Sequence, residues 1–295
     1  MPSIAINGQA YSSLTNALAA ATAGQVVDLG PGVFDPSPTS LAGVKAAGVT
    51  IRGAQTGGSS LFSNSRLFSR GTDGGSPPSG LSFEYLAFRY GTEFGSNNSG
   101  YLLSSSTGSV PYNPTNPTST GLSLNNVTLR GVHRGAQGAN GTYFDLSGSK
   151  DSSLSHVNVS LSGQTGYQAG NGTGGGYFLF FEGGDNLKII DSEFDESGYS
   201  SSLAILFSGN NTVTGNRFRG AGLTKQDDGQ DPADDPRGER FYNAGGLFSG
   251  NTLSGGSFLD FIYRSAEAGA VWTDFKSKHQ GSDGSYSLRT KVLNN

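Results

Sequence analysis

The sequence predicts an all-β fold, a single-domain parallel β-helix (solenoid) that begins with a short capping α-helix. Three observations lead to this prediction. Apolar residues recur with the spacing of strands, the same spacing returns along the chain, and a second apolar strand follows most of the copies. A helix would place apolar residues three and four positions apart throughout, which these segments do not. We therefore expect stacked rungs of two or three strands, in about eight to ten coils.

The repeated unit is typified by residues 81–88, LSFEYLAF, with apolar residues at its first, third, sixth and eighth positions. Alternation within each half is typical of a strand, and the two-residue step indicates a corner after which side chains point into the same core again. Further copies begin at five positions: Leu122, Ser152, Leu187, Asn211 and Gly246. The core positions of these units are expected to be buried: Phe83, Leu86, Phe88, Leu124, Val127, Leu129, Leu154, Val157, Val159, Ile189, Phe194, Val213, Phe218 and Leu253. Two polar residues, Asn216 and Asn251, occupy the third inward position, and we expect their buried amides to bond to backbone groups of adjacent coils.

The N-terminal region also fits a solenoid. Residues 23–34, AGQVVDLGPGVF, are interpreted as a strand that ends in a turn at Gly-Pro-Gly and restarts. The segment before it, at about residues 12–22, combines a Ser N-cap with apolar side chains on one helical face, which predicts a capping helix. We expect the β-helix with its cap to cover residues 1–275 and a C-terminal tail or cap to cover 276–295. Insertion loops are expected at 104–121 and 224–240.

Composition excludes several classes of function. The 295 residues carry a net charge of −4 and no basic run, so we expect no nucleic-acid partner. No apolar run approaches the roughly 18 residues that span a bilayer, so we expect no membrane span. No signal peptide is visible at the N-terminus. The chain has no Cys, which excludes disulfides and thiolate metal sites.

The capping helix, the stretch AGQVVDLGPGVF, the stretch GVTIRG at 48–53 and rungs such as NTVTGNRFRG and LFSGNTLSGG resemble the right-handed parallel β-helix superfamily that includes pectate lyases. The likeness covers roughly residues 3–275 and is one of architecture. It implies a right-handed coil. No catalytic signature of a family accompanies it, so an activity does not follow from the fold.

The repeat register places charged residues in two outward columns. The candidate catalytic residues are Asp195, Glu193, Arg217 and Arg219, and the candidate substrate-binding residues are Arg89, Arg130, His133 and Arg134. Two carboxylates about 7 Å apart along one strand can act as acid and base on a glycosidic bond. They can also hold Ca²⁺, with an Arg acting on an acidic sugar, as the pectate-lyase resemblance implies. The alternative is a solvent-exposed ladder of opposite charges.

A second group of carboxylates lies in the expected loop at 224–240. Asp227, Asp228 and Asp231 are candidate Ca²⁺ ligands, although their spacing differs from that of an EF-hand loop and a solvated acidic loop is the alternative. No two His have the spacing of zinc ligands. No cofactor is identified with certainty, and Ca²⁺ is compatible with these acidic residues.

Two functional hypotheses remain open. The first is a secreted or cell-surface protein that binds a polysaccharide and processes it as a lyase, hydrolase or epimerase. The second is a non-catalytic structural or adhesive surface module, such as a cell-surface repeat, a phage fibre part or a shell component. An oligomer is compatible with both. Flat solenoid faces suit long, repetitive ligands, whereas the lack of a catalytic signature favours the second hypothesis.

Overall fold

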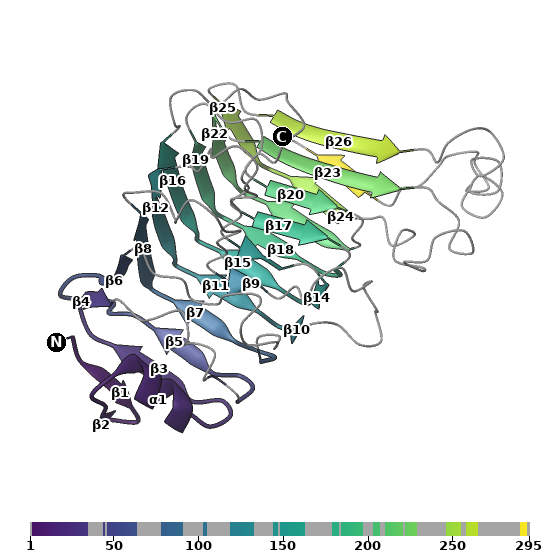
Figure 1. Ribbon diagram of the computed structural model, residues 1–295. Coiled ribbons are helices and arrows are strands. Elements are labelled where there is room, and N and C mark those ends of the chain that lie inside the picture. The colour runs from purple at the N-terminus through teal and green to yellow at the C-terminus, as the bar shows by residue number, and fades with distance from the viewer. Residues whose placement is uncertain are drawn as a thin grey trace, which may run out of the picture.

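The strands of the protein stack in coils from the N-terminal to the C-terminal end, as the ribbon of the computed structural model shows (Figure 1). The structure describes residues 2–34, 44, 46–63, 78–90, 103–104, 119–132, 144–146, 148–162, 179–182, 184–196, 203–206, 210–220, 222–228, 246–254, 258–264 and 290–293. Three sheets, here called A, B and C, run along the coil axis. Apart from β1 and β2, their described strands pair in parallel, and each pairs with the equivalent strand of the next coil. The predicted all-β parallel β-helix is thereby confirmed.

Sheet A is the longest of the three. In chain order it contains β1 (Ile4–Ile6), β2 (Gln9–Ala10), β3 (Val26–Leu29), β5 (Thr50–Arg52), β7 (Ser82–Glu84), β11 (Ser123–Asn125), β15 (Ser153–Ser155), β18 (Lys188–Ile190), β21 (Asn211–Thr214), β24 (Gly246–Ser249) and β27 (Thr290–Leu293). Within the described residues, the nine strands from β3 onward are parallel, which lies in the expected range of eight to ten coils. The strand β27 pairs with β24, so sheet A continues into the range 276–295.

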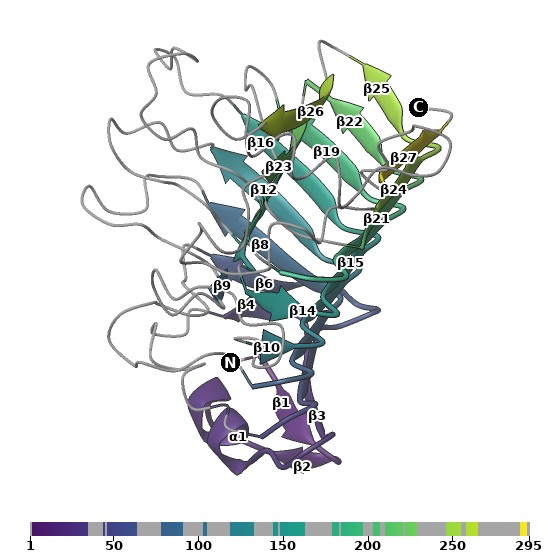
Figure 2. The same cartoon turned by 90° about the vertical axis from the view of Figure 1, so that its right-hand side faces the viewer.

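Sheets B and C complete the coils (Figure 2). Sheet B contains β4 (Gly32–Phe34), β6 (Ser60–Ser63), β8 (Leu86–Tyr90), β12 (Thr128–Val132), β16 (Asn158–Ser162), β19 (Glu193–Glu196), β22 (Arg217–Arg219) and β25 (Thr252–Ser254). Sheet C contains β9 (Leu103–Ser104), β13 (Phe144–Asp145), β17 (Leu179–Glu182), β20 (Leu203–Leu206), β23 (Gly222–Asp228) and β26 (Phe258–Arg264). A separate pair joins β10 (Ser119–Thr120) to β14 (Ser149–Lys150).

The N-terminal end of the coil is covered by α1 (Leu14–Ala20) and a β-hairpin (Figure 2). The helix is shorter than the expected range of about 12–22. Its N-cap is Ser13, whose Oγ accepts a hydrogen bond from the backbone N–H of Asn16, and Leu14 and Leu18 are buried. The hairpin is a feature that the sequence pattern did not reveal: β1 pairs antiparallel with β3 and so covers the first edge of the parallel strands of sheet A. An unpaired edge strand is a site of unwanted association, so this pairing protects the end of the sheet.

The two-residue step of the repeat is a corner between sheets A and B. In the six copies of the repeat the second corner residue has a left-handed backbone with φ between 48° and 68°. These residues are Tyr85, Asn126, His156, Asp191, Gly215 and Gly250. Their N–H groups from Tyr85 to Gly215 donate to carbonyl oxygens of the next coil, so the corners are bonded to one another along the axis. Gly, Asn and Asp favour this conformation, whereas Tyr85 and His156 adopt it because hydrogen bonds to the next coil hold them in place. A junction between the same two sheets explains the turn within residues 23–34, since Gly30-Pro31 joins β3 in sheet A to β4 in sheet B.

Gly53 occupies the corresponding corner of the preceding coil, where it leaves no space for a side chain. Its N–H donates to the carbonyl of Glu84, and a Cβ at Gly53 would overlap the carbonyl oxygen of Tyr85. We therefore expect Gly53→Ala to lower the free energy of unfolding by about 1 to 3 kcal/mol through overpacking. Denaturant unfolding measures this loss against the nearby outward change Thr50→Ala. Equal unfolding midpoints for the two variants would contradict the close approach.

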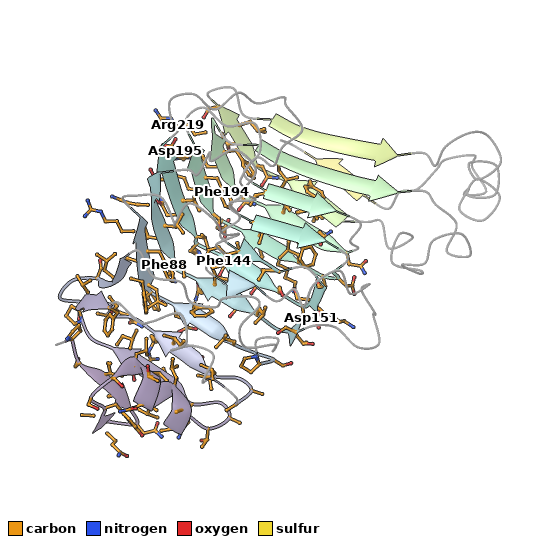
Figure 3. The ribbon with its side chains drawn as sticks, viewed as in Figure 1. Phe88, Phe144, Asp151, Phe194, Asp195 and Arg219 are labelled. Atoms are coloured by element: carbon orange, nitrogen blue, oxygen red, sulfur yellow. The ribbon has the colours of Figure 1, made fainter. Side chains whose placement is uncertain are left out.

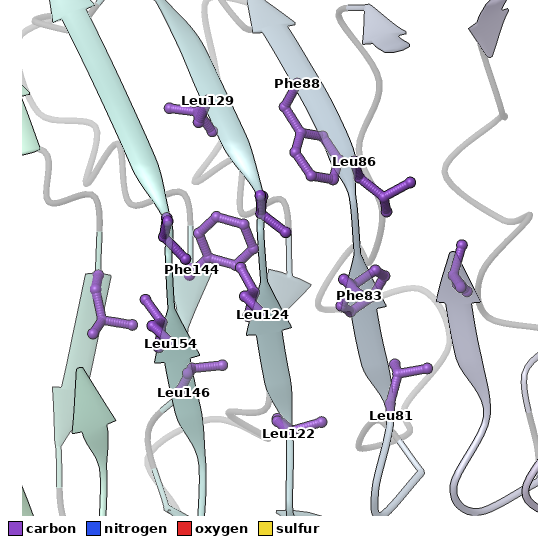
Figure 4. Packing of buried hydrophobic residues seen from close by; sticks show 14 of the residues in the cluster. Leu81, Phe83, Leu86, Phe88, Leu122, Leu124, Leu129, Phe144, Leu146 and Leu154 are labelled. Carbon is purple, nitrogen blue, oxygen red and sulfur yellow. The ribbon is translucent and has the colours of Figure 1, made fainter. Parts of the chain in front are cut away.

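The core lies between the three sheets and contains the side chains that the repeat predicted to point inward (Figure 4). The predicted core residues are buried, with one correction: Leu253 is only partly buried. It lies on β25, the terminal strand of sheet B among the described residues, so no described strand of that sheet covers it on the far side. Equivalent phenylalanines stack in register, with ring centroids 5.6 Å apart for Phe34–Phe62 and 5.3 Å apart for Phe62–Phe88.

A polar column runs through the core at the third inward position of the later coils. As expected, Asn216 and Asn251 are buried, with 1% and 3% of their surfaces exposed. The amide of Asn216 accepts from the N–H of Ser192 and donates to the carbonyl of Ile189, both on the preceding coil. Asn251 repeats the arrangement, because its Oδ1 accepts from the N–H of Asn216 and its Nδ2 donates to the carbonyl of Val213. The predicted stacking role of both amides is confirmed.

Candidate functional site

Sheet B presents two columns of side chains to the outside, and the observed register is the one that the repeat predicted. The first column contains Arg89, Arg130, Ser160, Asp195, Arg219 and Ser254 on consecutive strands. The second contains Ala87, Thr128, Asn158, Glu193, Arg217 and Thr252. Neighbouring members of a column lie on adjacent parallel strands, whose spacing is about 4.8 Å. We call these residues the sheet B face.

The buried residue between the columns fixes which side chains face outward. On β19 and β22 this residue is Phe194 and Phe218, whose rings are fully buried and stack with centroids 5.3 Å apart. Because successive side chains of a strand point to opposite faces, the residues on either side of each Phe must face solvent. Figure 3 shows Phe194 directed into the coil and Asp195 and Arg219 on its outer side. The predicted outward orientation of Asp195 is confirmed.

The candidate catalytic residues form two ion pairs between β19 and β22. Arg217 Nη1 lies 3.8 Å from Glu193 Oε1, and Arg219 Nη1 lies 3.7 Å from Asp195 Oδ2. The carboxylate side chains are 42% and 40% exposed, and the arginine side chains more so. These distances and exposures describe loose surface pairs, which contribute about 0 to 1 kcal/mol each to stability. The two ion pairs therefore place charge on the surface and contribute little to the stability of the fold.

A neighbouring amide extends this group and was not among the candidate residues from the sequence. Asn158, on β16, donates from Nδ2 to Glu193 Oε2 at 3.4 Å. Glu193 is thus placed between an arginine on one side and an amide on the other. The repeat register already put Asn158 next to Glu193 in the second column, so the signal was present in the spacing. An uncharged side chain does not stand out in a chain rich in Asn, so charge alone does not identify it.

Arg89 and Arg130 occupy a different part of the sheet B face. They are direct neighbours on β8 and β12, and both are exposed. Their strands are separated from the two ion pairs by β16, which contributes Ser160 and Asn158 to the columns. The structure thus assembles the catalytic candidates in one cluster and these two binding candidates in another. His133 and Arg134 follow β12 directly in the chain and lie outside the described residues.

The acidic segment at 224–240 requires a correction. Residues 222–228 form β23, which pairs with β20 and β26, so Asp227 and Asp228 lie in a strand and not in the expected loop. Asp231 lies outside the described residues. The loop expected at 104–121 is likewise shortened, because Ser104 ends β9 and Ser119–Thr120 forms β10. Among the residues that the structure describes, no group of three or more His, Asp or Glu side chains is placed to hold a metal ion.

Comparison with protein family models, with curated proteins and with solved structures gives no significant match. In the described part of the chain no helix has the length and apolar character needed to cross a membrane.

Proposed function

We propose that this chain is an extracellular or surface-associated β-helix protein of the pectate-lyase-like type that binds a polysaccharide along the sheet B face. The observation that carries the proposal is the concentration of charge on this face. Only 14% of the chain is charged, yet six charged side chains lie in its two adjacent columns: Arg89, Arg130, Glu193, Asp195, Arg217 and Arg219. A regular array of strands presents these groups at constant spacing, which suits a long ligand with repeating polar groups.

Processing of the bound polysaccharide is the further part of this proposal. Glu193 and Asp195 are on the same face of one strand, about 7 Å apart, and inverting glycosidases use carboxyl groups at comparable separation. In this role the two carboxylates act as acid and base, and Arg217 and Arg219 orient them or contact the sugar. The same carboxylates offer oxygen ligands that Ca²⁺ prefers, which would suit a lyase or epimerase.

A specific observation supports the alternative of a non-catalytic structural or adhesive module. Each carboxylate of the cluster already has an arginine within 4 Å on the neighbouring strand. Opposite charges on adjacent strands stabilise a sheet without any ligand. In that case the pairs keep the surface soluble, and loss of one carboxylate has no effect on ligand binding.

Replacement of Asp195 separates these functions. We expect Asp195→Ala to abolish binding or turnover of the polysaccharide while lowering the free energy of unfolding by only about 0 to 1 kcal/mol, because the lost ion pair is exposed. Wild type is first screened against uronic-acid and neutral polysaccharides. Affinity electrophoresis measures binding, ultraviolet absorbance detects unsaturated products of a lyase, and an assay of new reducing ends detects bond cleavage. The matched control is Glu84→Ala, which removes a carboxylate from the outward face of sheet A. Unchanged binding in Asp195→Ala would support the structural module.

A further inference from the structure

Arg89 and Arg130 are adjacent like charges, and no counter-charge pairs with them among the residues that the structure describes. Their residues are direct partners in the register of β8 and β12, and both side chains are exposed. Like charges directly opposite on neighbouring strands destabilise a sheet. The chain as a whole carries a net charge of −4, so an excess of arginine does not explain the arrangement. A bound anion between these two neighbouring arginines would offset their repulsion.

The other arginines of the described surface show the contrast. Arg52 Nε lies 2.8 Å from Asp28 Oδ1, and this hydrogen bond raises the pKa of Arg52. Arg217 and Arg219 each have a carboxylate within 4 Å. Among the side chains that the structure describes, neither Arg89 nor Arg130 has such a partner. Arginine side chains on this described surface are otherwise paired with a carboxylate, and Arg89 and Arg130 differ from them in this respect.

The nearest carboxylate in the same column is too far away to compensate them. Asp195 lies two strands beyond Arg130, with Ser160 between them. Two strand spacings are about 10 Å, which is close to the Debye length at physiological ionic strength. The neighbouring positions in the second column on β8 and β12 are Ala87 and Thr128, which carry no charge. Within the described part of the sheet B face, the positive charge of the two arginines is therefore available to an external anion.

We propose that Arg89 and Arg130 form an oxyanion site, so that the polysaccharide bound by the sheet B face is an acidic one. The inference depends on the proposed function and names the substrate class. A guanidinium group donates two parallel hydrogen bonds to an oxyanion, and two guanidinium groups on adjacent strands can bind one anionic group from both sides. Nucleic acid is the less suitable polyanion, since tracking its backbone takes several phosphate contacts and this chain is acidic overall.

Three dextrans with the same backbone test the charge requirement: neutral dextran, carboxymethyl dextran and dextran sulfate. We expect wild type to bind at least one anionic dextran and to bind neutral dextran much more weakly. The tighter of the two anionic forms identifies the oxyanion as a carboxylate or a sulfate. Affinity electrophoresis and titration calorimetry at low and high salt measure the difference, which is expected to fall as salt rises. Neutral dextran bound as tightly as both anionic forms would overturn the inference.

The double variant Arg89→Gln/Arg130→Gln tests the residues. We expect it to bind the preferred anionic dextran about tenfold or more weakly, as the loss of charged hydrogen bonds predicts. The control Lys150→Gln/Lys188→Gln removes the same charge from β14 and β18, away from sheet B, and should bind like wild type. Arg89→Lys/Arg130→Lys keeps the charge but not the forked geometry, and should fall between. Equal weakening by both Gln variants would indicate non-specific attraction and overturn the site.

Two outcomes separate this inference from the proposed function. Wild-type protein that binds no polysaccharide of any charge contradicts the proposed function as well. Polysaccharide binding that is unaffected in Arg89→Gln/Arg130→Gln contradicts only the oxyanion site. A single-stranded oligonucleotide bound as tightly as dextran sulfate, and lost in the same variant, would reassign the site to nucleic acid. Circular dichroism of each variant establishes that the fold is retained, which the exposure of both arginines leads us to expect.

Discussion

Replacing Phe62 by alanine is expected to lower the free energy of unfolding by about 3 to 5 kcal/mol, the range for large-to-small changes of a buried aromatic residue. Phe62 is 1% exposed and lies in the middle of a column of stacked rings. It contacts Phe34 on one side and Phe88 on the other, with centroids 5.6 Å and 5.3 Å away. The cavity would therefore remove ring contacts to both neighbouring coils at once. Chemical denaturation of the two proteins measures the difference.

The control for this prediction is Phe62→Leu, which keeps most of the apolar volume and should cost about 1 to 1.5 kcal/mol. Coils of a solenoid contact mainly their neighbours, so the effect of Phe62→Ala should be largest in the N-terminal coils. Hydrogen exchange should accordingly show earlier opening of β4, β6 and β8 than of β22. Equal losses for the alanine and leucine variants would mean that the ring stack is not tightly packed.

The register of the fold could be predicted because the repeat fixes which face of each strand is buried. A shift by one residue would turn Phe194 outward and Asp195 inward, and the core admits only one of these choices. The same constraint correctly predicted the neighbours of Asp195 on the next coil. The left-handed corners also had a signal, since Asn126, Gly215 and Gly250 favour this conformation, although Tyr85 and His156 do not show it.

Other features could not be predicted because they depend on neighbouring coils. Asp227 and Asp228 have low strand propensity, and their place in β23 follows from backbone pairing with β20 and β26, which overrides that propensity. Leu253 has the same local pattern as Phe218, and its partial exposure reflects its place on the last strand of sheet B that the structure describes. In the candidate site, the repeat register correctly predicted that Glu193 and Asp195 lie beside Arg217 and Arg219. The sequence did not show that Arg89 and Arg130 have no carboxylate partner among the described side chains, because such a pairing depends on which strands are neighbours.

Asn216→Leu is expected to lower the free energy of unfolding by about 3 kcal/mol, although leucine is the more apolar residue. Removal of the amide takes this partner from the N–H of Ser192 and the carbonyl of Ile189. The Oδ1 of Asn251 loses one of its two donors and keeps the backbone N–H of Asn216. Each buried group that loses its partner costs about 1 to 3 kcal/mol. The gain from burying a larger apolar side chain offsets part of this sum, because a Leu contributes about 1.5 to 3 kcal/mol on burial.

The control change Asn125→Leu makes the same substitution on the outward face of sheet A, where Asn125 is only partly buried and water can replace its hydrogen bonds. We expect Asn125→Leu to lower the free energy of unfolding by less than about 1 kcal/mol, because exposed groups that lose a partner can bond to water and buried groups cannot. Thermal and denaturant unfolding of both variants give the comparison. A melting temperature of Asn216→Leu equal to or above that of wild type would show that the neighbouring backbone groups find other partners. The Ser192–Asn216–Asn251 column would then be a consequence of the stacking of coils rather than one of its causes.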